Sequence, residues 1–258
     1  MVVRTRTLVW RQWFSARLQQ EQAKMQVELP QINIHTLTRT QFAGMIDHTL
    51  LKPEANRAMI AQVCMEAQTY GFAAVCVNPV NIMYCHQLLE GSLVAVCSVT
   101  GFPLGAARTR VKIFEARQGI KDGAREIDMV INIGLLKDQE YGAAEQDIME
   151  VAKVCHAEGA ILKVILETCL LTDEEKVAAC LLAQDAEADF VKTSTGLNGP
   201  GAAVRDVALM RSVVSLEMGV KAAGGIRDTE TALAMVAAGA NRIGASASVK
   251  IIEGLPRT

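Results

Sequence analysis

Aromatic side chains and long hydrophobic runs are both scarce in this sequence. Phe, Trp and Tyr make up only 4% of the 258 residues, although 50% of the residues are hydrophobic. The core must therefore be aliphatic, a composition that suits helices packed on a parallel sheet. No apolar run approaches the roughly 18 residues that a membrane-spanning helix needs, so no membrane partner is expected.

An excess of charge, a cysteine motif and a histidine cluster are missing as well. The 26 Lys and Arg residues nearly balance the 28 Asp and Glu residues, and the net charge of −2 argues against a nucleic-acid partner. None of the seven cysteines belongs to a CxxC pair, and the four histidines lack metal-ligand spacing. We therefore expect reduced thiols in a cytoplasmic protein that has neither a metal site nor a cofactor.

Residues 1–37 differ in composition from the rest of the chain. Four arginines precede the first acidic residue, Glu21, and both tryptophans lie here. One face of a helix would carry Trp10, Trp13, Phe14 and Leu18. This composition leaves a transit peptide or a membrane-surface helix open. We expect instead an extension that is poorly ordered or lies outside the natural start, followed by a single domain over residues 38–258.

Strands and helices alternate regularly from residue 38 onward. Thr38 and Gln41 have capping-box spacing, as do Thr172 and Glu175, and Pro53 is expected to open a further helix. Eight short apolar strands are expected near residues 46–51, 73–78, 93–99, 126–131, 161–167, 189–193, 218–223 and 241–244.

This alternation predicts the fold class. Each expected strand is followed by a helix, and right-handed crossovers between such units make the strands parallel. Eight units predict an α/β fold, a closed (β/α)₈ TIM barrel. A doubly wound open sheet is the alternative, but no GxGxxG motif follows the first strands. Helix-ending turns are expected at Gly123, Gly159 and Gly239, with Glu187 in the equivalent place.

The most unusual side chain is Lys192, which lies inside the apolar stretch Phe190-Val191-Lys192-Thr193. Burial lowers the pKa of a lysine from about 10.4, and a second nearby cation lowers it further. A neutral amine in a dry pocket attacks carbonyl groups, which is Schiff-base chemistry. Taken alone, the same lysine could instead reach solvent at the sheet edge or pair with a carboxylate.

Further charged residues lie in the other expected strands. Lys221 follows Lys192 by about one strand–helix unit, so the two should stand on adjacent strands, where one ammonium group depresses the pKa of the other. Asp128 interrupts a run of Ile, Met and Val and could pass protons through water. Asp47 and Lys163 are further pocket candidates, with Lys163 paired to a carboxylate. In a (β/α)₈ barrel such residues gather where the strands end.

Polar, glycine-containing turns follow the last three expected strands. Backbone N–H groups of such turns are typical anion sites, and the last two loops of this barrel fold commonly bind phosphate. The alternative is that these glycines only make tight turns. The phosphate candidates are Gly196, Gly224, Gly225, Arg227, Gly244 and Ser246.

A further pattern is carried by Ile46–Pro53, Val75–Pro79, Gly101–Gly105, Glu126–Asn132, Leu162–Thr168, Phe190–Gly196, Val220–Arg227 and Arg242–Ser246. Together these stretches resemble the deoxyribose-phosphate aldolase family, and the resemblance covers about residues 40–252. Ala223 and Ala247 depart from the family pattern, which often has small hydroxyl residues there.

The resemblance implies a class I aldolase, an aldehyde-lyase that interconverts 2-deoxy-D-ribose 5-phosphate with D-glyceraldehyde 3-phosphate and acetaldehyde. It makes Lys192 the Schiff-base lysine, Lys221 the neighbour that lowers its pKa and takes part in proton transfer, and Asp128 the acid–base partner that acts through water. The six residues of the glycine turns would hold the phosphate. Because an imine turns the departing carbanion into an enamine, neither a metal nor a cofactor is required.

Two other functions stay open from the residues alone. One is a different phosphate-sugar barrel enzyme, an isomerase or synthase in which Lys192 acts through its charge and forms no imine. The other is a non-enzymatic barrel that binds a phosphorylated ligand or a partner, although a binder has no need of Lys192, Lys221 and Asp128 together. A homodimer is expected, but outer helices look alike whether they are solvated or paired.

Overall fold

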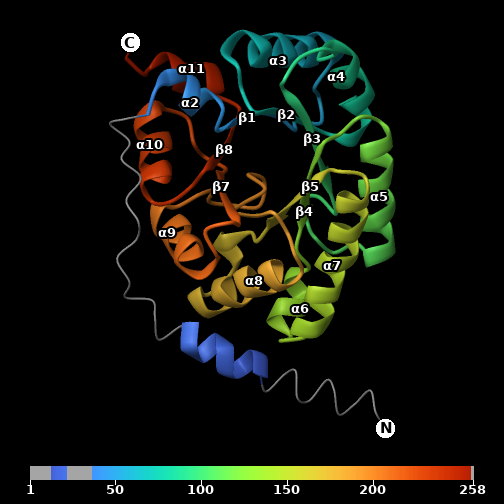
Figure 1. Ribbon diagram of the computed structural model, residues 1–258, viewed down its shortest axis with the longest axis vertical. Coiled ribbons are helices and arrows are strands. Elements are labelled where there is room, and N and C mark those ends of the chain that lie inside the picture. The colour runs from blue at the N-terminus through green and yellow to red at the C-terminus, as the bar shows by residue number, and fades with distance from the viewer. Residues whose placement is uncertain (1–12, 22–36, 257–258) are drawn as a thin grey trace.

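Eight parallel strands close into a barrel in the computed structural model, which describes residues 13–21 and 37–256. Each strand pairs with its neighbour in sequence, and the first strand pairs with the eighth to complete the ring (Figure 1). The predicted (β/α)₈ TIM barrel is confirmed, and the open sheet is excluded. The strands are β1 (Ile46–Leu50), β2 (Ala74–Val77), β3 (Ala95–Thr100), β4 (Glu126–Val130), β5 (Ile161–Ile165), β6 (Phe190–Lys192), β7 (Gly219–Ala223) and β8 (Arg242–Ala245).

Helices cover the outside of the barrel and connect successive strands (Figure 1). Within the described ranges, no helix is both long and apolar enough to pass through a membrane. The elements are α2 (Arg39–Ala43), α3 (Arg57–Tyr70), η2 (Pro79–Asn81), α4 (Ile82–Leu88), α5 (Thr109–Lys121), α6 (Ile133–Lys137), α7 (Tyr141–Ala157), η3 (Thr168–Leu170), α8 (Asp173–Asp185), α9 (Val204–Val213), α10 (Thr229–Ala237) and α11 (Ser248–Glu253).

The turns from helix to strand have the left-handed backbone that a glycine-ended helix predicts. The φ angles are 113° at Gly123, 70° at Gly159 and 106° at Gly239. Glu187 takes the same conformation at φ 60°, although a residue with a Cβ atom rarely does so. Both predicted capping boxes, which begin at the N-caps of α2 and α8, are also present.

The start of α3 differs from the prediction. Pro53 lies in a turn, and the helix begins at Arg57. The reason is local, because the side chain of Asn56 accepts a hydrogen bond from the amide of Met59 at 3.0 Å and caps the helix there.

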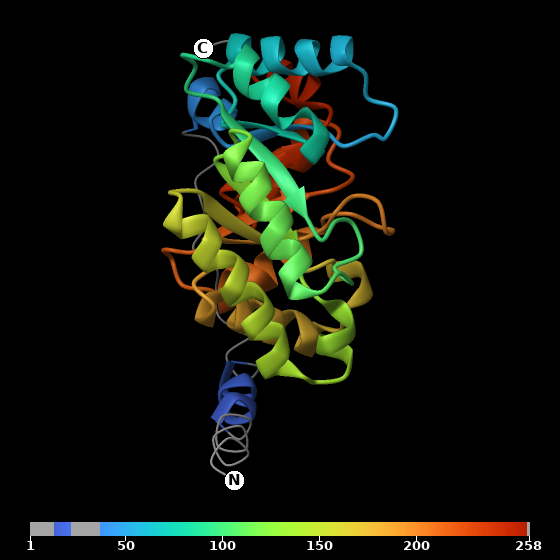
Figure 2. The same ribbon diagram turned by 90° about the vertical axis from the view of Figure 1, so that its right-hand side faces the viewer.

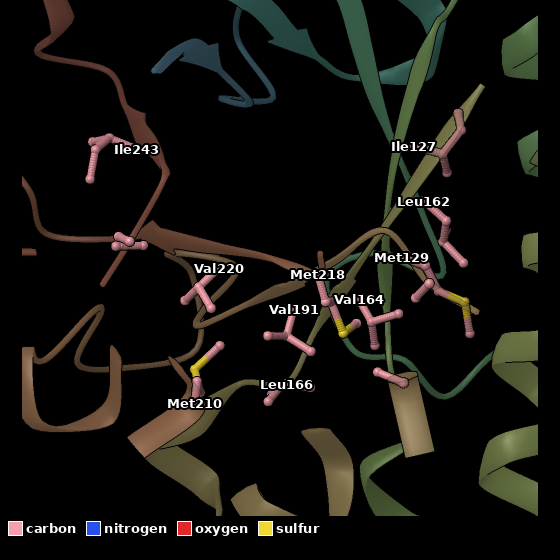
Figure 3. Close-up of a cluster of buried hydrophobic side chains, with 14 of the residues drawn as sticks. Ile127, Met129, Leu162, Val164, Leu166, Val191, Met210, Met218, Val220 and Ile243 are labelled. Carbon is pink, nitrogen blue, oxygen red and sulfur yellow. The ribbon is translucent and has the colours of Figure 1, made fainter. Parts of the chain in front are cut away.

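The two faces of the strands have different characters, because successive residues of a strand point to opposite sides of a sheet. The outward residues are apolar and pack against the helices (Figure 3). The residues that alternate with them, including Asp128, Lys163, Lys192 and Lys221, point into the barrel. The main hydrophobic core therefore lies between the barrel and its helices, and it includes Ile127, Met129, Leu162, Val164, Val191, Val220 and Ile243 with Met210 of α9.

Phe190 fills the interior at the start of β6. A Cβ atom on Gly219 of the adjacent strand would lie 2.1 Å from Cε1 of Phe190, so only glycine leaves room for the ring. The guanidinium of Arg242 lies 5.6 Å from the centre of the same ring. These three residues occupy the end of the barrel where strands begin, opposite to the end where active sites of this fold lie.

Residues 13–21 form a helix beside the barrel (Figures 1 and 2). Phe14 is fully buried, and its ring centre lies 5.1 Å from that of Tyr141 at the start of α7. Arg17 forms an ion pair with Asp185 at the end of α8. This part of the extension therefore packs on the outside of α7 and α8.

A helix is present in the extension over residues 13–21, but the side chains expected to share one of its faces differ in burial. Phe14 is buried, whereas Trp13 is 52% exposed, so the two side chains do not share one buried face. Trp10 lies outside the described residues. Leu18 is partly buried and packs against the core cluster.

Candidate active site

The charged residues predicted for the site meet inside the barrel. Lys192 of β6 is in register with Lys221 of β7, and Asp128 of β4 is in register with Lys163 of β5. None of the four residues is more than 3% exposed. Paired positions on neighbouring strands face the same side of the sheet, which is why two lysines one strand–helix unit apart become neighbours.

Asp128 is the centre of this group. Its Oδ2 atom accepts hydrogen bonds from Nζ of Lys192 at 2.8 Å and from Nζ of Lys221 at 2.7 Å. Its Oδ1 atom accepts one from Nζ of Lys163 at 2.8 Å. The two lysines of β6 and β7 therefore share one carboxylate oxygen, which places their amines close together.

Further ion pairs continue the network around the barrel. Asp47 of β1 accepts hydrogen bonds from Lys221 and, at 2.7 Å, from Arg242 of β8. Nζ of Lys163 lies 2.6 Å from a carboxylate oxygen of Glu126. Both pocket candidates, Asp47 and Lys163, thus belong to one buried network of ion pairs inside the barrel.

The sequence reasoning missed Glu126 and Arg242 as members of this network. Each stands two residues before an interior position, Asp128 in β4 and Gly244 in β8. The period of two along a strand places such residues on the same face. That periodicity is the signal that could have found them.

The ion-pair network around Asp128, within the described residues, contains four cationic side chains and three carboxylates. Lys163 contacts three carboxylates within 4.0 Å and Lys221 contacts two, whereas Lys192 contacts one. Lys192 is thus the lysine of this network with the fewest carboxylate contacts. The cations are Lys163, Lys192, Lys221 and Arg242, and the carboxylates are Asp47, Glu126 and Asp128.

The electrostatic environment defines the resting charges of two of these groups. Burial alone would raise the pKa of Asp128, but Lys163, Lys192 and Lys221 together hold it well below its ordinary value. Burial alone would lower the pKa of Lys221, but Asp128 and Asp47 raise it above its ordinary value. Asp128 is therefore an anion, and Lys221 a cation, near neutral pH.

Two groups of donor atoms within the described residues are close enough together to resemble metal ligands, namely Cys76 with Cys97 and Asp128, and Asp47 with Cys97 and Glu126. The ammonium group of Lys163 already interacts with both groups. Its Nζ atom lies 3.3 Å from Sγ of Cys97 and forms ion pairs with Asp47, Glu126 and Asp128. Burial, with further contributions from Cys76 and Asp128, raises the pKa of the Cys97 thiol well above its ordinary value. A protonated thiol is a poor metal ligand.

The predicted phosphate turns come together after β6 and β7. A Cβ atom on Gly224 would lie 2.9 Å from Cα of Gly201 and 3.3 Å from Cα of Gly196, so the two loops touch. The φ angles are 85° at Gly196, 92° at Gly224 and 76° at Gly225, a region that favours glycine. Gly225 and Arg227 are exposed at the same turn. Backbone amides and a guanidinium are thus available to an anion.

The two candidates that follow β8 differ from each other. Ser246 is exposed, as a residue that contacts a ligand should be. Gly244 is buried, and a Cβ atom there would lie 3.0 Å from Cε of Lys221 and 3.0 Å from Cβ of Ala223. Gly244 therefore makes space for the side chain of Lys221.

Comparison with known proteins shows the family of this chain. The family described as DeoC/LacD family aldolase matches residues 42–254. Deoxyribose-phosphate aldolase 1 of Bacillus licheniformis is 59% identical over 215 residues, which cover 83% of this chain and 96% of that protein. The chain belongs to the DeoC/LacD aldolase family. The family resemblance expected from the sequence motifs is thereby confirmed.

Further relatives of this aldolase support the same assignment. Deoxyribose-phosphate aldolase of Thermococcus kodakarensis is 57% identical over 85% of this chain and 99% of its own length. A solved chain from Coccidioides immitis superimposes with a TM-score of 0.88 at 42% identity and covers 94% of this chain and 96% of that one. Tetrameric deoxyribose phosphate aldolase from Aeropyrum pernix has a TM-score of 0.79 at 37% identity, with 84% and 91% covered.

The buried network should make the aldolase sensitive to acid. The pKa values of Asp47 and Asp128 lie below the ordinary value because, despite burial, surrounding lysines stabilise their anions. Such groups add stability above the unfolded pKa of about 3.9 and lose that contribution as the pH falls towards the folded pKa. We expect the Tm, measured by scanning calorimetry, to decline below about pH 4.5. Asp128→Asn should start from a lower Tm at pH 7 and decline less steeply, and an equal slope would contradict this origin.

Proposed function

We propose that this aldolase reversibly cleaves 2-deoxy-D-ribose 5-phosphate to D-glyceraldehyde 3-phosphate and acetaldehyde through a Schiff base on Lys192. The substrate is proposed from the names of the relatives. They are deoxyribose-phosphate aldolases, and the chain aligns with nearly the whole length of each. The observation that carries the mechanism is the contact of Lys192 with a single carboxylate, Asp128, in an ion-pair network of four cationic side chains and three carboxylates.

In the first step, the neutral amine of Lys192 attacks C1 of the open-chain sugar. The resulting carbinolamine loses water to give an iminium ion, in which nitrogen takes the place of the carbonyl oxygen. The proton of the C3 hydroxyl group is then removed, and the C2–C3 bond breaks. Its electron pair moves into the iminium and forms an enamine, while C3 becomes the aldehyde of D-glyceraldehyde 3-phosphate. Protonation of the enamine at C2 and hydrolysis release acetaldehyde and restore Lys192.

Asp128 is the proposed acid–base group for these proton transfers. Its pKa is held low by the three lysines despite burial, so it begins the cycle as a carboxylate and accepts a proton through a water molecule. Lys221 begins the cycle as a cation beside the reacting nitrogen and takes part in proton transfer by releasing and regaining its proton. Asp47 and Lys163 hold the charged partners of these groups in place.

The phosphate of the substrate is proposed to bind at the turns after β6, β7 and β8. Exposed Arg227 provides a positive charge, and glycine turns provide backbone N–H groups. The proposed phosphate set is Gly196, Gly224, Gly225, Arg227, Gly244 and Ser246. Within this set, the proposed role of Gly244 is to leave space for the side chain of Lys221. The imine itself acts as the electron sink, so the proposed chemistry runs without a metal or a cofactor.

The test is a reductive trap. Incubation with acetaldehyde and borohydride should add one ethyl-sized mass increment to the protein, and peptide mass spectrometry should find it on Lys192. Exposed lysines such as Lys153, whose side chain is 60% exposed, serve as internal controls. The absence of an adduct, or adducts spread over exposed lysines, would favour an imine-free enzyme that binds phosphorylated sugars.

Three wider assignments accompany this function as proposals. Residues 38–258 would form the catalytic domain and residues 1–37 an extension, in keeping with the family match that begins at residue 42. The seven free thiols support a cytoplasmic location. A homodimer is proposed for this chain, whereas the related Aeropyrum pernix aldolase is a tetramer.

A further inference from the structure

Glu167 is a buried carboxylate just beyond the end of β5 that the mechanism above does not use. It is 1% exposed and has a left-handed backbone with φ 58° and ψ 61°. Residues with a Cβ atom rarely adopt this conformation, and they keep it only where surrounding contacts stabilise it. The hydrogen bonds of the Glu167 side chain are the contacts that stabilise it.

The carboxylate of Glu167 binds the segment that follows Lys192. It accepts hydrogen bonds from the backbone amide of Thr195 at 3.2 Å and from the Thr195 hydroxyl at 2.5 Å. It accepts a third from the side-chain amide of Asn198 at 2.9 Å. One side chain on the β5–α8 loop thus holds two residues of the β6–α9 loop, on either side of Gly196.

A third loop is joined to the same group. The side-chain amide of Asn198 also donates to the carbonyl of Pro103, in the β3–α5 loop, at 3.0 Å. The hydroxyl of Thr195 accepts a hydrogen bond from the amide of Leu197 at 3.1 Å. The turn that contains Gly196 is therefore fixed from both sides, and within the described residues the amide of Gly196 itself has no hydrogen-bond partner.

The charge of Glu167 matters for this arrangement. No Lys or Arg among the described residues lies within ion-pair distance of it, so the three donors from Thr195 and Asn198 solvate the carboxylate. A glutamine at this position would carry one NH₂ group. In either orientation of that amide, a donor would face the donors of Thr195 or Asn198. A carboxylate fits this position, whereas its neutral isostere does not.

We propose that Glu167 is a positioning residue that holds the Gly196 turn in its anion-binding form, and that it thereby selects phosphorylated over unphosphorylated 2-deoxyribose. This inference rests on the proposed function and deepens it. Within the described residues, no hydrogen bond or ion pair joins the side chain of Glu167 to Lys192, Lys221 or Asp128. Its effect should therefore fall on recognition of the phosphate and leave imine formation intact.

The experiment compares kcat/KM of Glu167→Gln for 2-deoxy-D-ribose 5-phosphate and for 2-deoxy-D-ribose. The ratio of the two values should fall at least tenfold relative to the unaltered protein, mainly through KM for the phosphorylated sugar. Trapping of acetaldehyde on Lys192 should be unchanged. The matched control is Glu175→Gln on the neighbouring helix α8, where glutamine preserves the capping box and the ratio should stay constant.

The outcomes separate the possible roles of Glu167. A purely structural role would lower both kcat/KM values in parallel and leave their ratio unchanged, which would overturn the inference, as would full activity of Glu167→Gln. If Glu167→Gln does not fold, Asn198→Ala replaces it, since that change removes the bonds to Glu167 and Pro103 only, and a constant ratio there overturns the inference equally. If the unaltered protein itself forms no adduct and cleaves neither sugar, the proposed function fails, and this inference fails with it.

Discussion

Lys192→Met should abolish cleavage of 2-deoxy-D-ribose 5-phosphate while the folded barrel survives. Methionine has nearly the length of lysine but no nucleophile, so the loss in kcat should be at least ~10⁴-fold, as for other covalent catalysts. The variant removes the one cation in excess and leaves three cations facing three carboxylates. We therefore expect a Tm at or above that of the unaltered protein, together with the loss of the acetaldehyde adduct.

A matched control is available on the adjacent strand. Lys163→Met makes the same chemical change at a side chain that contacts Glu126, Asp128 and Asp47. Removing one partner of a buried ion pair costs about 3–5 kcal/mol, so this variant should unfold at a lower temperature. Wild-type turnover in Lys192→Met, or a fall in its Tm as large as that of Lys163→Met, would contradict the roles assigned here.

Lys221→Leu should lose most activity at neutral pH, by roughly 10²-fold or more. The variant also leaves three cations and three carboxylates in the interior, but Lys192 is now one of those cations. With Lys221 absent, Lys192 and Lys163 are the lysines that still form ion pairs with Asp128. Because one neighbouring cation beside Lys192 is removed, we expect the pH optimum of cleavage to rise.

The two lysine variants are distinguished by trapping at different pH values. Acetaldehyde trapping in Lys221→Leu should be slow at pH 7 and recover as the pH is raised, whereas Lys192→Met should form no adduct at any pH. The Tm of Lys221→Leu should fall only moderately, because Asp47 retains Arg242 at 2.7 Å. An unchanged pH profile in Lys221→Leu would refute its role as the neighbouring charge.

Several features of this aldolase are encoded locally and could be predicted from the sequence. The capping boxes at Thr38 and Thr172, and the left-handed turns at Gly123 and Gly239, depend on residues at most a few positions apart. Eight repeats of strand and helix then leave few topologies, because crossovers between parallel strands are right-handed. That Lys192 and Lys221 are neighbours inside the barrel follows from their spacing within that repeat.

Some errors arose where two local signals competed. Pro53 is a good first residue of a helix, yet the side chain of Asn56 caps α3 and the helix starts at Arg57. In the extension, the pattern predicted a shared helix face but not which of its side chains would be buried. Phe14 is buried and contacts Tyr141 whereas Trp13 is exposed, and the position of Tyr141 in space cannot be inferred from the extension itself.

The sequence by itself determined the barrel, its order of strands and the identity of the buried lysines, because periodicity and caps are local properties of the chain. Only the tertiary structure decided which charges meet. Three sets of contacts join residues on different strands and loops. Lys192 and Lys221 share one oxygen of Asp128, and Glu126 and Arg242 are further ion-pair partners. Glu167 forms hydrogen bonds with the turn after β6. Such pairings depend on the register and closure of the whole barrel, which no single stretch of sequence contains.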